Sequence, residues 1–246
     1  MTQPSAATAY SQIRRWIVEG RFRPEEHLIE QRIAEELDLS RTPVREALRR
    51  LQSEGLVRFE ANRGASVRSL TISDIADLYE LRARLESMAA ELAATRATPD
   101  QLERLAAAEK AFAEAAEAAG VAGDGDREAT RRVFHQNDVF HLTFLEAAHH
   151  ERLVQTLVRT VDPTLVFQAF RHYRPSGLQR SVLFHHLINE AIRRGEGVRA
   201  GGLIYEHVMQ GRDQLLAVVG DDTSVDALYE ELPVERAGGE HQDLRH

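Results

Sequence analysis

The chain has 246 residues, of which 43% are hydrophobic and 28% are charged, and it contains no cysteine. This composition is typical of a soluble globular protein with one large or two modest domains, and the missing cysteines exclude disulfides, thiolate metal sites and cysteine nucleophiles. No run approaches about 18 consecutive apolar residues and no apolar signal segment is visible, so we expect a cytoplasmic protein without a membrane partner.

The charge is distributed unevenly along the chain. The formal net charge is -8, yet residues 1–70 contain 12 arginines against 10 acidic residues. Seven of these arginines lie between Arg41 and Arg68. A basic face here would bind phosphates while the acidic remainder limits unspecific binding, although a solvated charged helix would give the same counts.

Three short helices are predicted near the N-terminus. Apolar residues recur at helical spacing over about 9–19, and Gly20 is a typical terminator. A second helix begins at about residue 30. The third follows Ser40, a favourable N-cap residue, and has Pro43 in its first turn.

Two short strands are predicted next, LVRFEA and ASVRSL, joined by the turn NRG with Gly64 as its flexible position. Three helices and a two-stranded ribbon describe a winged helix-turn-helix. On the third helix Arg41, Arg45 and Arg49 are four residues apart and share one face. Guanidinium groups suit base edges and phosphates, so we expect residues 1–70 to bind double-stranded DNA.

The stretch LIEQRIAEELDLSRTPVREALRRLQSEGLVRFEANRGASV resembles the signature of the GntR family of bacterial transcription regulators along its whole length. The resemblance includes the SRTPVREAL core, the EGLV step into the wing and the wing itself. It implies that side chains of the third helix and the wing contact operator DNA, namely Arg41, Thr42, Arg45, Arg49, Arg63 and Gly64. Gln31 stands where some members have a DNA-contacting arginine, so no contact is assigned to the second helix.

From residue 71 onward the sequence predicts only helices. Thr71 and Asp74 form a capping-box pattern, and an alanine-rich helix begins at about residue 99. Further helices are predicted at about 127–148, 150–171, 176–194 and 197–219, with Pro163 kinking or breaking the second of them. We therefore expect a mainly α fold, with an antiparallel helical bundle over residues 71–220 and a flexible acidic tail over 221–246.

Two histidines, His141 and His207, lie within apolar segments of this predicted bundle. A buried histidine needs a hydrogen-bond partner or a metal. If the last two helices turn at Gly195, His185 and His207 lie level with each other, each about 15–18 Å from the turn. Asn137 lies four residues before His141 and faces the same way. Three imidazoles and one oxygen suit zinc, nickel or manganese, although satisfied core histidines are the alternative.

The segment from about 72 to 220 resembles the FCD ligand-binding domain of FadR-like GntR regulators, through LYELRARLE, DVFHLTFLEAA and HHLINEAIRRGE followed by EHV. The resemblance implies a metal site, with zinc the first expectation and with four ligands, Asn137, His141, His185 and His207. Asn137 replaces the usual aspartate, and a neutral amide binds a dication more weakly than a carboxylate does. Asp138 is an alternative ligand if the helix rotates.

Arg82, in LYELRARLE, matches a position where the FCD family commonly has a basic residue near the effector cavity. The alternative role of Arg82 is a surface ion pair with Glu86, four residues further along the chain. In the first case a carboxylate effector would bind the metal and pair with the guanidinium group.

The predicted function is that of a homodimeric, ligand-responsive DNA-binding regulator, a repressor released from its operator by a small organic acid, and not an enzyme. Two alternatives remain. One is a metal-dependent hydrolase, although no motif such as H-E-x-x-H supplies a base. The other is a regulator whose metal site is purely structural.

Overall fold

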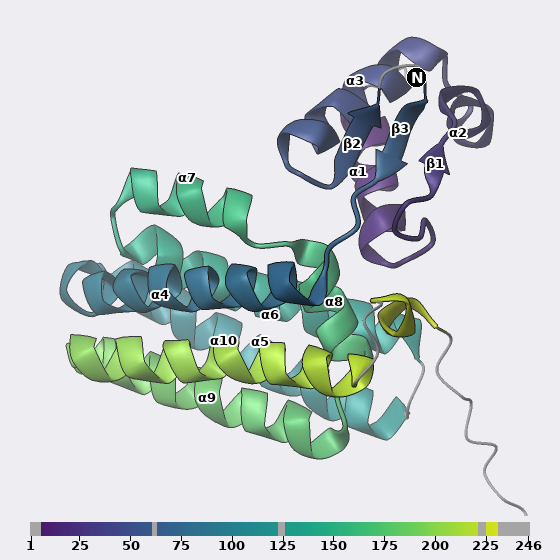
Figure 1. The fold of residues 1–246 in the computed structure, drawn as a ribbon. Helices are drawn as coiled ribbons and strands as arrows, with labels where there is room; N and C mark the ends of the chain where they lie inside the picture. Colours follow the sequence, from purple (N-terminus) through teal and green to yellow (C-terminus); the bar gives the residue numbers. More distant parts are fainter. Residues whose placement is uncertain (1–5, 61–62, 123–125, 221–224, 231–246) are drawn as a thin grey trace, which may run out of the picture.

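The structure is a computed structural model that describes residues 6–60, 63–122, 126–220 and 225–230 (Figure 1). It is mainly helical within these ranges and has two hydrophobic cores, one built from residues up to Val67 and one from Leu70 onward. Figure 1 shows the N-terminal part on one side of a bundle of long helices, with a single connection leading from one to the other. None of the described helices is long and apolar enough to cross a membrane.

Within its described residues, the N-terminal part contains three helices and three strands: α1 (Ala6–Val18), β1 (His27–Leu28), α2 (Glu30–Leu37), α3 (Arg41–Ser53), β2 (Val57–Glu60) and β3 (Gly64–Val67). Ile13 of α1 and Leu48 and Leu51 of α3 are fully buried and form the centre of its core. Ser40 stands at the N-cap of α3 as predicted, but its side chain makes no capping hydrogen bond.

The three strands form one antiparallel sheet in the order β1-β3-β2, with Val57 opposite Val67 and His27 opposite Ser66. The predicted two-stranded wing is therefore extended by β1, which at two residues is too short to show an alternating pattern. Gly64 has φ +81°, the left-handed conformation expected of the flexible turn position. Asn62 of that turn and the adjacent Ala61, the last residue of the first predicted strand, lie outside the described residues.

The helical part contains seven α-helices and a short 3₁₀ helix among the described residues: α4 (Ile72–Arg96), α5 (Pro99–Ala122), α6 (Arg127–Ala147), α7 (Glu151–Thr160), α8 (Pro163–Arg171), α9 (Pro175–Arg193), α10 (Gly197–Val219) and η1 (Asp226–Tyr229). The predicted capping box at the start of α4 is confirmed. The backbone N–H of Asp74 donates to Thr71 Oγ1 at 3.1 Å, and that of Thr71 donates to Asp74 Oδ2 at 2.8 Å.

The helix predicted over 150–171, with a kink or break at Pro163, is divided into two helices, α7 and α8, and the predicted break lies just before Pro163. Pro163 occupies the first position of α8, where its missing N–H is tolerated. Asp162 is the N-cap of α8 and accepts a hydrogen bond from the backbone N–H of Thr164 at 2.8 Å. The break leaves α7 beside α4 and turns α8 into the bundle (Figure 1).

Of the segment 221–246, predicted as a flexible tail, the structure describes residues 225–230. Val225, which precedes η1, and Leu228 within η1 are buried in the core of the helical part. These two apolar residues therefore pack against the bundle. Residues 221–224 and 231–246 lie outside the described residues.

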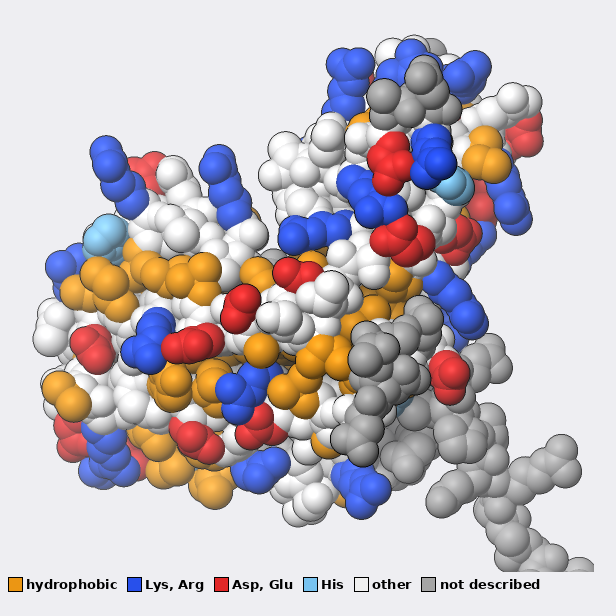
Figure 2. All heavy atoms as spheres, in the orientation of Figure 1, with side chains coloured by type: hydrophobic (Ala, Val, Ile, Leu, Met, Phe, Trp, Pro, Cys, Tyr) orange, Lys and Arg blue, Asp and Glu red, His pale blue; other side chains and the backbone are white. Residues whose placement is uncertain are grey.

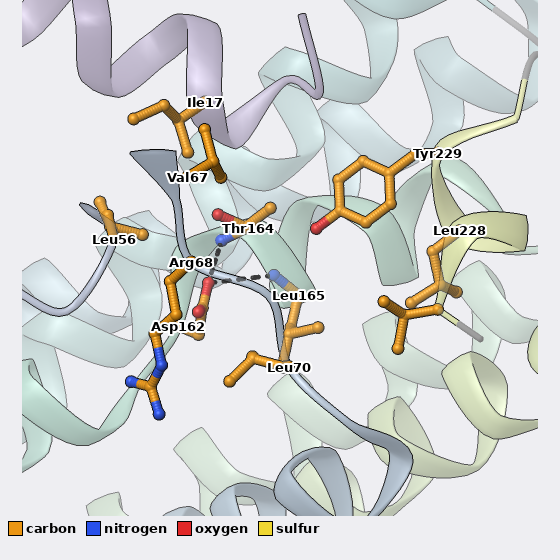
Figure 3. A pocket seen from close by; sticks show the side chains of 11 residues that line it. Ile17, Leu56, Val67, Arg68, Leu70, Asp162, Thr164, Leu165, Leu228 and Tyr229 are labelled. Atoms are coloured by element: carbon orange, nitrogen blue, oxygen red, sulfur yellow. Dashed lines mark hydrogen bonds between the residues drawn. The ribbon is translucent and has the colours of Figure 1, made fainter. Parts of the chain in front are cut away.

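The two parts meet at a junction formed by α1, β3, α8 and η1 (Figure 3). Ile17 and Val67 from the N-terminal part lie close to Leu165 of α8 and to Tyr229 of η1, around a void of about 20 Å³. Asp162 caps α8 at the edge of this void. The N-terminal part thus packs directly on α8.

Candidate functional site

The arginines predicted to contact DNA lie on the exposed face of α3. Arg45 donates to Glu30 of α2, with Nη2 2.7 Å and Nε 2.9 Å from the two carboxylate oxygens, and Arg41 Nη2 lies 3.4 Å from the same carboxylate. The hydrogen bond from Arg45 is the main reason that the pKa of Glu30 is lowered. Glu30 therefore holds both guanidinium groups in place, an interaction that the sequence reading did not anticipate.

The other predicted DNA contacts are also exposed. Thr42 and Arg49 lie on α3, and neither side chain is buried. Arg63 is 75% exposed and lies 3.6 Å from Glu60 across the wing. No atom lies within 4 Å of the position that a Cβ would occupy on Gly64. Figure 2 shows several basic side chains on the visible surface of the N-terminal part.

Three histidines meet inside the helical part, His141 from α6, His185 from α9 and His207 from α10. All three are buried, and one ring nitrogen of each lies within 4.8 Å of those of the other two. The Nε2 atoms of His185 and His207 are 3.2 Å apart. The predicted turn between α9 and α10 is present at Gly195, which brings these two residues level as the spacing indicates.

The burial of His185 and His207 favours their neutral form, which can donate a lone pair. Burial lowers the pKa of His185 and of His207 well below the usual value, and the neighbouring histidines add to the effect. His141 Nδ1 lies 2.6 Å from Glu86, while its buried Nε2 has no hydrogen-bond partner among the described residues. A carboxylate on one nitrogen and a free second nitrogen are typical of a metal-binding histidine.

Asn137 is positioned to supply an oxygen to the cluster. It is buried on α6, one turn before His141, and its side chain makes no hydrogen bond with any described residue. Asp138 is exposed and lies outside the histidine cluster. The residues present therefore fit a divalent ion with three nitrogen ligands and one amide oxygen, a donor set suited to zinc, nickel or manganese.

Arg82 makes the ion pair with Glu86 that was one of its two predicted roles, with Nε 2.6 Å from Oε1. The pair is not at the surface, because the two side chains are 9% and 1% exposed. Burial acts to raise the pKa of Glu86, but the charge of Arg82 and the contact with His141 outweigh it and hold that pKa well below its usual range. Glu86 thus contacts both Arg82 and His141, and the three buried side chains form a continuous series of polar contacts.

The side chains of Arg82, Glu86 and His141 line a cavity of about 450 Å³. One part of its wall is polar and includes Arg82, Asn137 and His141, and another part is apolar and includes Leu157 and Val166. Further lining residues come from the N-terminal part, among them Tyr10, Arg14 and Arg50. The cavity can accept a small molecule with an acidic head and an apolar body, in contact with both parts of the chain.

The sequence reading did not connect Glu86 with His141, because the two residues are 55 positions apart. A signal was present nonetheless. Tyr79, Arg82, Ala83 and Glu86 recur at helical spacing, and all four are buried on one face of α4. The lowered pKa of Glu86 and its ion pair make it a poor general base, which argues against a hydrolase built on this cluster.

Comparison with known proteins gives consistent matches over both parts of the chain. The family model "Bacterial regulatory proteins, gntR family" matches residues 5–67, and the FCD domain model matches residues 77–210. The HTH-type transcriptional regulator YdhC of Bacillus subtilis is 31% identical over 177 residues, which cover 72% of this chain and 75% of YdhC.

A second relative is the Nta operon transcriptional regulator of Aminobacter aminovorans, 30% identical over 80% of this chain and 88% of its own length. Among solved structures, a GntR regulator from Rhodococcus has a TM-score of 0.65 at 27% identity, covering 86% of this chain and 97% of that one. These relatives are transcription regulators.

Proposed function

Because the chain belongs to the GntR family of bacterial regulatory proteins and carries an FCD domain, we propose that it is a repressor released from its operator by a small carboxylate. The observation that carries this proposal is the cavity of about 450 Å³ shared by the two parts. Its lining includes His141 of the histidine cluster, Asn137 and Arg82 from the helical part, together with residues of α1 and α3. A ligand there contacts the sensor and the DNA-binding part at once.

DNA binding uses the exposed face of α3 and the wing. Arg41, Arg45 and Arg49 enter the major groove with Thr42, while Arg63 and Gly64 at the wing reach the adjacent backbone or groove. Because Arg41 and Arg45 already pair with Glu30, both side chains are restrained before DNA binds, and less side-chain entropy is lost on binding. The protein acts as a homodimer on a roughly palindromic operator.

The sensor binds a divalent ion, with zinc the first choice, through His141, His185, His207 and Asn137. Such an ion, when bound, supplies open coordination positions for a carboxylate. Arg82 lies beside the cluster and offers N–H donors to the same ligand, since Glu86 occupies only its Nε. Effector and operator then prefer different arrangements of the two parts, and the effector weakens DNA binding by its differential affinity for them.

The DNA-binding role is tested with Arg45→Ala in the full chain. A gel-shift titration with the protein's own promoter fragment should show affinity reduced by about tenfold or more, because a bidentate arginine contact contributes about 1–3 kcal/mol. Arg199→Ala is the matched control, since Arg199 is an exposed, ion-paired arginine on α10. Equal operator affinity for Arg45→Ala and wild type would contradict the proposal.

The sensor role is tested by screening organic acids for release of that promoter fragment from the metal-loaded chain. Arg82→Gln should abolish the response to the active acid while the metal content stays unchanged. A chain that binds the metal and the promoter but responds to no acid would instead favour a purely structural metal site. Metal analysis together with a ligand-induced thermal shift separates these outcomes.

A further inference from the structure

A second cavity of about 450 Å³ lies at the junction. It shares no lining residue with the first cavity, which contains Arg82 and His141. We call it the arginine cavity, because among the described residues its wall contains one carboxylate, Glu19, and five arginines, Arg15, Arg21, Arg23, Arg127 and Arg131. The first three arginines belong to the N-terminal part and the last two to α6. Five like charges around one cavity repel one another unless an anion neutralises them.

Two of these arginines are already neutralised. Arg131 donates to Glu19, with Nε 2.7 Å and Nη2 2.8 Å from its two carboxylate oxygens, and it also pairs with Glu128. Arg21 pairs with Glu36 and lies over the ring of Trp16 at 4.2 Å.

The remaining three, Arg15, Arg23 and Arg127, form no ion pair with any described residue. Arg15 donates only to the neutral side chain of Gln12, at 2.8 Å. The neighbouring Asp126 caps α6 by accepting from two backbone N–H groups and forms no ion pair with these arginines. Three unpaired guanidinium groups therefore remain around the cavity.

The contact between Arg131 and Glu19 also joins the two parts of the molecule. Within the described residues it is the single ion pair that links the N-terminal part to the helical part. Its Glu19 carboxylate is 16% exposed and faces the arginine cavity. An anion that entered the cavity would compete with Glu19 for Arg131.

We propose that the arginine cavity binds a phosphate-bearing anion, a free pyrophosphate or the polyphosphate of a nucleotide, and that this anion displaces Glu19 from Arg131. Arginine suits this ligand because its planar N–H groups match two phosphate oxygens at once. Trp16 and Tyr229 supply aromatic surface in the same wall. Binding would remove the ion pair across the junction, and so provide an input to DNA binding that is separate from the carboxylate sensor.

The chain contains a built-in reporter for this test, since Trp16 is its only tryptophan and lines the cavity. Sodium pyrophosphate is titrated into the full chain at constant ionic strength, with sodium chloride as the reference salt, and tryptophan emission is followed. A saturable change is expected with pyrophosphate only. A response that does not saturate, or that chloride reproduces, would overturn the proposal.

Charge-removing variants locate the site. Arg127→Gln and Arg15→Gln should each raise the Kd for pyrophosphate by about tenfold, as expected for loss of one charge-assisted contact. Arg132→Gln is the control, because Arg132 is exposed on α6 and does not line the cavity. An unchanged Kd in both test variants, or an equal rise in the control, would refute the assignment.

Two further outcomes are decisive. Glu19→Gln removes the competing carboxylate and should lower the Kd for pyrophosphate severalfold, whereas a raised Kd would contradict the displacement. Double-stranded DNA is the alternative polyphosphate ligand for these arginines. If Arg127→Gln weakens binding to the promoter fragment while the Kd for pyrophosphate keeps its wild-type value, the arginines contact the DNA backbone and the proposal fails.

Discussion

Asn137 would supply a neutral amide oxygen as the fourth ligand of the proposed metal ion, at a position where a carboxylate would also fit. Asn137→Asp would place a carboxylate there without changing side-chain size, so we expect the affinity for zinc to rise by about tenfold or more. Competition with a chromophoric chelator measures the zinc affinity of the variant and of the wild type. Asp138→Asn is the control, because Asp138 is exposed beside the cluster and its change should leave the affinity unaltered.

Glu86 compensates the buried charge of Arg82 and orients His141. Glu86→Gln would leave the guanidinium group buried without a counter-charge, so the free energy of unfolding should fall by about 3–5 kcal/mol. Glu80→Gln breaks an exposed ion pair with Arg84 at the same spacing and should cost less than about 1 kcal/mol. Urea denaturation of both variants compares them, and equal losses would show that burial does not decide the value of the pair.

The histidine cluster could be predicted from the sequence because a helical hairpin fixes which residues lie level. His185 and His207 follow from the position of Gly195, and Asn137 and His141 follow from helical spacing. The burial of Arg82 with Glu86 could not be predicted in the same way. It depends on which neighbours cover that face of α4, and spacing within one helix carries no information about them.

At the scale of elements, α4 and α10 approach each other closely through glycines of α10. A Cβ on Gly201 would lie 2.7 Å from Glu91 Oε1 and 2.9 Å from Ser87 Oγ, and that hydroxyl already donates to the carbonyl oxygen of Gly201. Gly201→Leu should therefore lower the free energy of unfolding by about 1–3 kcal/mol through overpacking.

The adjacent Gly202 provides the control for this contact. No atom lies within 4 Å of its Cβ position. Gly202→Leu should therefore raise the stability by about 0.5–1 kcal/mol, because leucine favours a helix over glycine. Thermal unfolding of the two variants measures both effects. The same sign of change in both would mean that helix propensity, and not close packing with α4, governs this region.

The long helices were the most predictable elements. The predicted range 197–219 coincides with α10, and glycine at each end accounts for the agreement. Two short elements were not predicted. β1 contains two residues and is held by pairing with β3, and η1 is held by burial of Leu228. Neither has a repeating pattern of its own, so each depends on contacts with distant parts of the chain.

At the scale of the whole molecule, η1 holds residues 225–230 beside the junction. The side chain of Leu228 is fully buried, and its carbonyl oxygen lies 3.1 Å from His172 Nε2. Leu228→Ala should lower the free energy of unfolding by about 2–5 kcal/mol through the cavity that it creates. Leu183→Ala, at a leucine that is 53% exposed, should change it by less than about 1 kcal/mol. Denaturation of both variants with guanidinium chloride measures these changes. A small loss for Leu228→Ala would show that η1 is only loosely attached.

The break before Pro163 gives α8 contacts in two directions. Val166 lines the cavity that contains Arg82 and His141, and Thr164 and Leu165 line the void beside the N-terminal part. A shift in the position of α8 therefore changes both the cavity and the void. Equilibrium coupling of this kind is reciprocal. Under the proposed function, the factor by which the acid lowers the affinity for the promoter equals the factor by which the promoter lowers the affinity for the acid. Copies bound to DNA would then bind the acid more weakly than free copies, and the free copies would respond first as the acid accumulates.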